Sequence, residues 1–170
     1  EHEERQPTMS SSRHNNDAGF FNEQCWLTAH NAWHTNQNPG NNQSRTITEL
    51  LDYGVRGFAL DIWGDGDATN WSHLHLQHGE NNPASAIDWS KILQELSAWL
   101  AIPANSSEIV TLFFESYLTG KAVDALDASL KTIPCYKSGK ATQAAAIHDK
   151  KLASLVSDNH RLFAFLQEEP

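Results

Sequence analysis

Short apolar runs alternate with amphipathic segments along most of this chain. The apolar runs predict β-strands over residues 26–30, 55–62, 74–78, 109–115 and 161–166. In the segments between them, apolar residues recur at the spacing of one helical face, which predicts helices over residues 46–53, 84–101, 120–131 and 148–157. Strands that alternate with helices are typical of a parallel α/β sheet with right-handed crossovers.

Two of these helices have recognisable boundary residues. Thr46 and Glu49 have the spacing of a capping box, and Gly54 suits the left-handed position that ends a helix. Pro83 suits the first turn of the helix over 84–101. Residues 1–22, by contrast, are polar and without periodicity, so we predict a loose N-terminal arm before a domain over residues 23–170.

The strand over 55–62 indicates which side chains share a face of the sheet. Gly57, Ala59 and Asp61 point to one face, and the bulky residues between them point to the other. Small side chains with one acid suit the lumen of a barrel, whereas bulky side chains suit contact with covering helices. Arg56 faces away from Asp61, which favours a structural ion pair over contact with a phosphate.

The other strands also end on polar residues, namely His30, His78 and Glu115, and alternation turns His75 away from the lumen. Parallel β/α barrels carry their catalytic groups at the carboxyl ends of their strands. Two histidines held across one pocket can act as base and acid on a phosphate ester. We therefore predict an α/β fold of the TIM-type (β/α) barrel, with an active site that includes both histidines and Asp61.

The length of the chain limits how much of such a barrel it can form. A complete barrel has about 250 residues and eight strands, whereas this chain has 170 residues and five predicted strands. The strand over 161–166 is as apolar as the central ones and has no Lys or Pro to protect an edge. We expect this chain to form the N-terminal half of a barrel that a second chain or a missing segment completes.

Composition narrows the partners and the compartment. A net charge of −9 excludes simple electrostatic binding to nucleic acid or to an anionic membrane. No apolar stretch approaches the roughly 20 residues that cross a bilayer.

Cys25 and Cys135 predict either a structural disulfide outside the cell or two free buried thiols. Three Asn-x-Ser triplets favour secretion, and a start at Glu1 is expected of a processed product; the triplets begin at Asn42, Asn70 and Asn105.

Four motifs, taken together, resemble a known family. They are TAHNA at residues 28–32, VRGFALD at 55–61, LQHG at 76–79 and VTLFFE at 110–115. In order and spacing they resemble the X region of phosphatidylinositol-specific phospholipase C, over roughly residues 24–166. That family has a TIM-type barrel, and its reaction is an attack by the inositol 2-hydroxyl on the adjacent phosphodiester.

The resemblance also implies roles for the site residues. His30 is the expected general base for the 2-hydroxyl, and His78 is the expected acid for the leaving glycerol oxygen. The roles reverse when the cyclic phosphate is hydrolysed, and Asp61 is the third expected catalytic residue. The implied substrate is a phospholipid or another inositol phosphodiester.

The chain departs from the family pattern where the phosphate charge must be neutralised. The resemblance to the calcium-dependent branch implies a calcium site of Asn31, Asp61 and Glu115, with help from Asp65 or Asp67 unless these lie in a solvated turn. A second acid of that branch is replaced by Ala59. The calcium-independent branch instead has an arginine at the position of Trp63.

These departures keep two other functions open. One is a phosphodiesterase for another lipid or glycerol headgroup. The other is a non-catalytic, lectin-like or toxin-like binding module that kept the barrel but lost the complete site. Membrane contact through Trp33, Trp63 and Trp71 is a further possibility, with buried packing of these rings as the alternative.

Overall fold

A single mixed sheet of six strands organises the described part of the chain. In this computed structural model residues 19–33, 42–65, 70–80, 86–137 and 147–167 are described. The strands are β1 (Thr28–His30), β2 (Gly57–Gly64), β3 (His75–Leu76), β4 (Ile87–Asp88), β5 (Val110–Leu118) and β6 (Leu162–Gln167). Their order is β4-β3-β2-β5-β6, and β1 also pairs with β2.

Four of the six strands are parallel, as the sequence predicts. β1 and β5 pair with β2, and β6 pairs with β5, all in parallel. The third predicted strand is an exception, because β3 pairs antiparallel with β2 and β4 pairs antiparallel with β3. A parallel return needs a crossover of about a dozen residues or more, usually a helix. Only residues 65–74 separate β2 from β3, which is too short for one.

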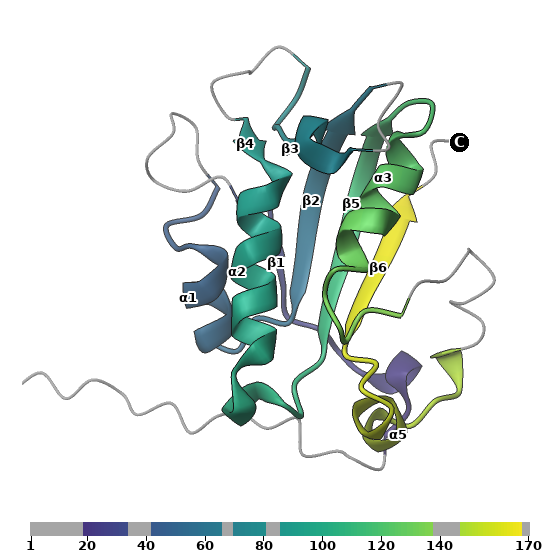
Figure 1. The fold of residues 1–170 in the computed structure, drawn as a ribbon. Coiled ribbons are helices and arrows are strands. Elements are labelled where there is room, and N and C mark those ends of the chain that lie inside the picture. The colour runs from purple at the N-terminus through teal and green to yellow at the C-terminus, as the bar shows by residue number, and fades with distance from the viewer. Residues whose placement is uncertain (1–18, 34–41, 66–69, 81–85, 138–146, 168–170) are drawn as a thin grey trace, which may run out of the picture.

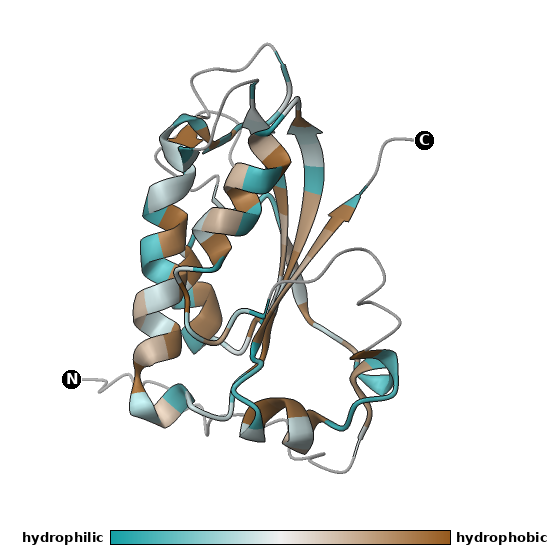
Figure 2. Ribbon diagram, turned by 45° about the vertical axis from the view of Figure 1, so that its right-hand side comes forward, coloured by the Kyte–Doolittle hydropathy of each residue, from teal (hydrophilic) through white to brown (hydrophobic). Residues whose placement is uncertain are grey.

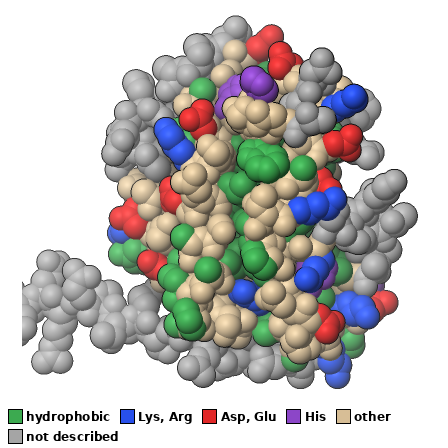
Figure 3. All heavy atoms as spheres, viewed as in Figure 1, with side chains coloured by type: hydrophobic (Ala, Val, Ile, Leu, Met, Phe, Trp, Pro, Cys, Tyr) green, Lys and Arg blue, Asp and Glu red, His purple; other side chains and the backbone are tan. Residues whose placement is uncertain are grey.

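Helices cover one face of the sheet. They are α1 (Ile47–Asp52), α2 (Trp89–Ala101) and α3 (Ala122–Leu130). In Figure 1 α2 and α3 lie in front of the strands, and α1 lies beside α2. The hydrophobic stripes of these helices face the sheet in Figure 2. On the outer surface of the same face, acidic and basic side chains are interspersed around the margin (Figure 3).

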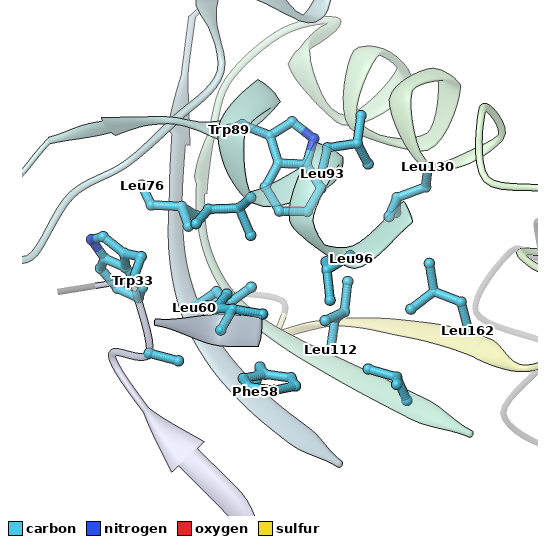
Figure 4. Packing of buried hydrophobic residues seen from close by; sticks show 14 of the residues in the cluster. Trp33, Phe58, Leu60, Leu76, Trp89, Leu93, Leu96, Leu112, Leu130 and Leu162 are labelled. Atoms are coloured by element: carbon cyan, nitrogen blue, oxygen red, sulfur yellow. The ribbon is translucent and has the colours of Figure 1, made fainter. Parts of the chain in front are cut away.

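The core lies between these helices and the sheet. Phe58, Leu60 and Ile62 of β2 are completely buried there, which confirms the face predicted for the bulky residues of this strand. They belong to the same cluster as Trp89 and Leu96 of α2. Figure 4 shows Phe58 and Leu60 within this cluster. Each such side chain stabilises the fold by roughly 1.5–3 kcal/mol through burial of apolar surface.

Arg56 forms a buried ion pair on this side of the sheet, as predicted. Its Nε lies 2.8 Å from Oε2 of Glu108, and both side chains are buried. Its Nη1 donates to the carbonyl oxygens of Leu51 and Val55, at 2.6 and 2.9 Å. The guanidinium lies over the ring of Trp99, 4.8 Å from its centroid. These contacts fix the start of β2 to the helical layer.

A second, smaller apolar cluster lies at the amino end of the strands. It joins α5 (Leu152–Ser157) to the 3-10 turn Phe21–Glu23, which lies beside α5 at the foot of Figure 1. Phe21 is buried against Phe163, with ring centroids 4.7 Å apart. The end of the predicted loose arm is therefore packed, whereas residues 1–18 of that arm lie outside the described residues.

Two predicted helices have different bounds in the structure. The helix expected over 84–101 begins at Trp89, because Ile87–Asp88 form β4 instead. Pro83, expected in the first turn, therefore precedes the helix and lies outside the described residues. The helix expected over 148–157 is interrupted before α5, where Lys151 forms a bridge to Phe20. Two further 3-10 turns were not predicted, Trp71–His73 and Pro103–Asn105.

Candidate active site

The face of the sheet opposite the helices carries aligned rows of side chains. In register, His30 lies beside Ala59, Ala59 beside Phe113, and Phe113 beside Phe165. Neighbours in a parallel ladder point to the same face, so these side chains form one row. Phe113 and Phe165 stack, with ring centroids 5.7 Å apart.

The next row toward the carboxyl ends is polar. Asp61 lies directly beside Glu115, and Glu115 lies beside Gln167. Above them Trp63 is paired with Tyr117, and their rings stack with centroids 4.0 Å apart and an interplanar angle of 7°. The face is therefore apolar toward the amino ends and polar or aromatic toward the carboxyl ends.

A cavity of about 400 Å³ opens on this face. Three of the predicted site residues, His30, Asp61 and Glu115, line it. The remaining lining residues are Ala59, Leu60, Phe113, Phe114, Phe165, Leu166 and Gln167. The volume falls in the range of pockets that enclose small ligands, roughly 300–1,000 Å³.

Asp61 is the electrostatic centre of the site. Its side chain is buried, with 7% of the residue exposed, and its pKa is raised to about 6. Burial is the largest cause and the charge of Glu115 acts in the same direction, while the charges of His78 and His30 oppose both. Both histidines are therefore near enough to Asp61 for their positive charges to interact with its carboxylate.

His78 reaches this site from a loop and not from the end of a parallel strand. β3 ends at Leu76, which is fully buried on the helical side opposite Ile62. His75 is the partner of Trp63 and shares its face, so the predicted orientation of His75 away from the lumen is wrong. The prediction extended strand alternation as far as His78, but β3 ends at Leu76, so the face of His78 does not determine the face of His75.

Asn31 lies directly after β1 in a left-handed conformation, with φ of 49°. Its backbone N–H donates to the carbonyl oxygen of Ala59 at 3.0 Å. The side chain is completely buried, and neither Nδ2 nor Oδ1 has a hydrogen-bond partner among the described residues. An orphaned buried amide is costly, so it marks a position suited to a ligand.

The oxygen donors present match the chemistry that calcium prefers. Asp61 and Glu115 supply adjacent carboxylates, and Asn31 supplies an unpartnered amide oxygen. Calcium takes six to eight oxygen ligands, and Ala59 contributes none. In the described part of the chain, no three His, Cys, Asp or Glu side chains are grouped as a metal site. Asp67 lies outside that part, and Asp65 is exposed.

Comparison with known proteins identifies the family. A family model described as PI-PLC X 1 matches residues 20–169. The chain belongs to the PI-PLC X family. A PI-PLC X domain-containing protein of Arabidopsis thaliana is 31% identical, and the match covers 85% of this chain and 36% of that protein.

The fold of this PI-PLC X chain is also found in solved structures. Two structures of phosphatidylinositol-specific phospholipase C from Staphylococcus aureus match with TM-scores of 0.64 and 0.62, at 12% and 15% identity. Each match covers 89% of this chain and 50% of the other. The chain thus has the α/β architecture of about half of that barrel, as the sequence predicts.

Tyr117 and Gln167 are site residues of this PI-PLC X chain that sequence reasoning missed. The predicted strand stopped at Glu115, but β5 continues to Leu118. Extending the alternation of this strand by two residues places Tyr117 on the same face as Glu115. The Tyr117 hydroxyl donates a hydrogen bond to Oε1 of Glu115.

The three tryptophans considered for membrane contact mostly pack against other side chains. Trp33 is buried, Trp71 packs against the core, and Trp63 is stacked on Tyr117. Cys25 is exposed and Cys135 is buried, and both thiols are free, so the two do not form a disulfide. Within the described ranges, no helix combines the length and hydropathy needed to cross a bilayer.

Proposed function

We propose that this chain carries the catalytic half of a phospholipase C-type phosphodiesterase that acts on an inositol phosphodiester. The observation that supports this most is the convergence of His30, Asp61 and Glu115 on one cavity, with His78 acting electrostatically on Asp61. A general base and a general acid near one carboxylate can catalyse intramolecular phosphoryl transfer.

The proposed reaction has two steps. His30 takes the proton of the inositol 2-hydroxyl, and the hydroxyl oxygen attacks phosphorus. The bond from phosphorus to the glycerol oxygen breaks as His78 donates a proton to that oxygen, which leaves a cyclic phosphate. In the second step His78 takes a proton from water and the water oxygen attacks phosphorus. The bond from phosphorus to the 2-oxygen breaks as His30 donates its proton to that oxygen, which restores the 2-hydroxyl. Imidazole suits both roles because it titrates near neutral pH.

Asp61 contributes through its charge. Burial raises the pKa of Asp61, and the charges of His78 and His30 lower it, so this carboxylate and the two imidazoles attract each other when charged. Neither step requires Asp61 itself to transfer a proton.

A calcium ion is part of the proposal. Asn31, Asp61 and Glu115 would hold it through their oxygen atoms, with water completing the coordination. When bound, the ion would supply positive charge opposite the phosphate, which no arginine provides at the position of Trp63. Its presence would also relieve the repulsion between the two adjacent carboxylates.

Closure of the barrel is also proposed. The four parallel strands described here are half of the eight strands that a TIM-type barrel contains. Phe113 remains 37% exposed on the lumen face, and beyond Tyr136 at its start β6 has no described partner on its outer edge. A further segment or chain that pairs with β6 would cover both features.

Release of inositol phosphate tests this function. The protein, isolated with any chain that copurifies, is incubated with phosphatidylinositol with and without chelator, and the water-soluble phosphates are identified. Release of a cyclic inositol phosphate supports the proposal. Release of phosphates from other lipids only would favour a phosphodiesterase for another headgroup. Binding of lipid without cleavage would favour a non-catalytic module, and the replacement of an acid by Ala59 would explain the lost activity.

Secretion is the proposed location. Asn42 and Asn70 are exposed and would be accessible to glycosylation, whereas the Nδ2 of Asn105 donates to the carbonyl oxygen of Trp99 at 2.9 Å. Recovery of the protein from the medium of its source cells, with a mass that falls on enzymatic deglycosylation, supports this location. Recovery only from the cytosol contradicts it.

A further inference from the structure

Trp63 and Tyr117, hereafter the aromatic pair, stand directly above the two carboxylates. They follow Asp61 and Glu115 by two residues on the same strands and are partners in the same ladder. Their parallel rings are 4.0 Å apart, so each ring restricts the rotamers of the other. Neither residue is a proton donor or acceptor in the proposed reaction.

Each member of the aromatic pair also makes a polar contact directed toward a group of the site. The hydroxyl of Tyr117 donates to Oε1 of Glu115. The indole N–H of Trp63 donates to the carbonyl oxygen of Gln77 at 2.8 Å, and Gln77 directly precedes His78. The pair therefore connects the carboxylate of one strand to the loop that carries the candidate acid.

The loop at His78 depends on few described backbone contacts with the sheet. β3 contains only His75 and Leu76, so the ladder ends two residues before His78. Gln77 then has its N–H bonded to the carbonyl oxygen of Asp61 at 3.2 Å and its own carbonyl bonded to Trp63. Its side chain donates to the carbonyls of Gly79 and Glu80, at 2.9 and 3.1 Å.

Glu115 has a similar need for support. Its side chain is exposed, and its neighbour in the ladder is the like-charged Asp61. Repulsion between carboxylates favours rotamers of Glu115 that turn away from the cavity. A hydrogen bond from a tyrosine whose ring is itself fixed by stacking opposes that movement.

We propose that the aromatic pair positions the site: Trp63 fixes the loop that places His78, and Tyr117 orients the carboxylate of Glu115. The inference rests on the proposed function, because it assigns His78 and Glu115 the roles given there. This positioning role accounts for an aromatic residue at position 63. A charged side chain at the same position would face the phosphate. Positioning within fractions of an ångström is what general acid catalysis requires.

Trp63→Phe tests the first half. Phenylalanine can keep the stack on Tyr117 but cannot donate to Gln77. Two substrates are compared, an inositol phosphodiester with an alkyl leaving group and one with a nitrophenyl leaving group, which departs without needing a proton. We expect kcat for the alkyl substrate to fall at least ~10-fold and that for the nitrophenyl substrate to change less than ~3-fold, because a general acid supplies roughly 10²–10⁴-fold.

Trp99→Phe is the matched control, since it removes an indole hydrogen bond to Asp52 far from the cavity. It should leave the ratio of the two rates unchanged. Equal losses on both substrates in Trp63→Phe, or no loss on either, would overturn the assignment of Trp63 while the proposed function stands. A wild-type protein inactive on both substrates would instead overturn the proposed function, and this assignment with it.

Tyr117→Phe tests the second half through calcium binding measured by calorimetry. Loss of a hydrogen bond to a metal ligand typically weakens affinity 10–100-fold, so we expect Kd for calcium to rise at least ~10-fold. Tyr53→Phe is the control, because Tyr53 is exposed and its ring contacts only the Arg45 guanidinium among the described contacts. An unchanged Kd in Tyr117→Phe, or a wild-type chain that binds no calcium, would overturn the role of Tyr117.

Discussion

Asp61 and Glu115 are direct neighbours in the ladder between β2 and β5, with both side chains on the lumen face. Burial and the charge of Glu115 raise the pKa of Asp61 to about 6. The fold thus places the carboxylates of Asp61 and Glu115 where they repel each other. His30 and His78 are near enough for their charges to act on Asp61. Carboxyl groups with a raised pKa in a cavity are typical of functional sites.

Asp61→Asn should stabilise the chain at neutral and alkaline pH. The folded-state pKa of Asp61, about 6, lies above its ordinary value of 3.8, so folding favours the neutral carboxyl. That stabilisation is complete below the unfolded pKa and is lost as the pH rises through about 6. At pH 8 we expect Asp61→Asn to increase the free energy of unfolding by about 1–2 kcal/mol.

Urea unfolding in the presence of chelator measures this effect, and the difference between the variant and the wild type should shrink toward pH 4. Equal stability of the two proteins at pH 8 would show that Asp61 is not strained in the fold. Asp158→Asn, at a surface turn, serves as the control and should have no comparable dependence on pH.

Glu115→Gln should make activity more dependent on calcium. The amide keeps the size of the side chain but removes one negative charge from the proposed metal site. We expect the loss of activity to be larger at low than at high calcium, and a calcium titration of the rate measures it. Wild-type activity that persists unchanged in excess chelator would contradict the calcium site and indicate a cationic side chain in its place.

Glu108→Ala should destabilise the fold strongly. It leaves the buried guanidinium of Arg56 without its carboxylate, and removing one partner of a buried pair typically costs about 3–5 kcal/mol. Lys131→Ala breaks the exposed pair with Asp127 and should cost less than about 1 kcal/mol. Thermal or urea unfolding compares the two; similar small losses would mean that the Arg56 pair contributes little.

The native mass should exceed that of this chain. Phe113 is 37% exposed, and beyond its bridge to Tyr136 the outer edge of β6 has no partner among the described residues, so we expect at least ~100 further residues folded against the lumen face. Native mass spectrometry of the active protein decides between the two cases. An active, folded monomer of 19.0 kDa would contradict closure by any further segment.

Much of the site could be predicted from the sequence because β2 alternates strictly. Small residues and Asp61 on one face and bulky residues on the other leave only one orientation that buries the core. That orientation fixes the side of the sheet on which Glu115 and His30 lie. The same reasoning applies to Arg56, whose predicted ion pair is confirmed.

The region after β2 could not be predicted in this way. The run at 74–78 is too short for its pattern to distinguish a parallel from an antiparallel strand, and the deciding signal is the length of the connection before it. The roles of the aromatic pair could not be predicted for another reason. Its roles depend on long-range contacts, from Trp63 to Gln77 and from Trp63 to Tyr117, which no local pattern reveals.

The most direct test of the proposed mechanism is ³¹P NMR of the products formed from phosphatidylinositol by the wild type, His30→Ala and His78→Ala. We expect a cyclic inositol phosphate to form first with the wild type, and each variant to stay folded but to be at least ~10²-fold slower. Normal turnover by either variant, or an acyclic phosphate as the first product, would contradict it.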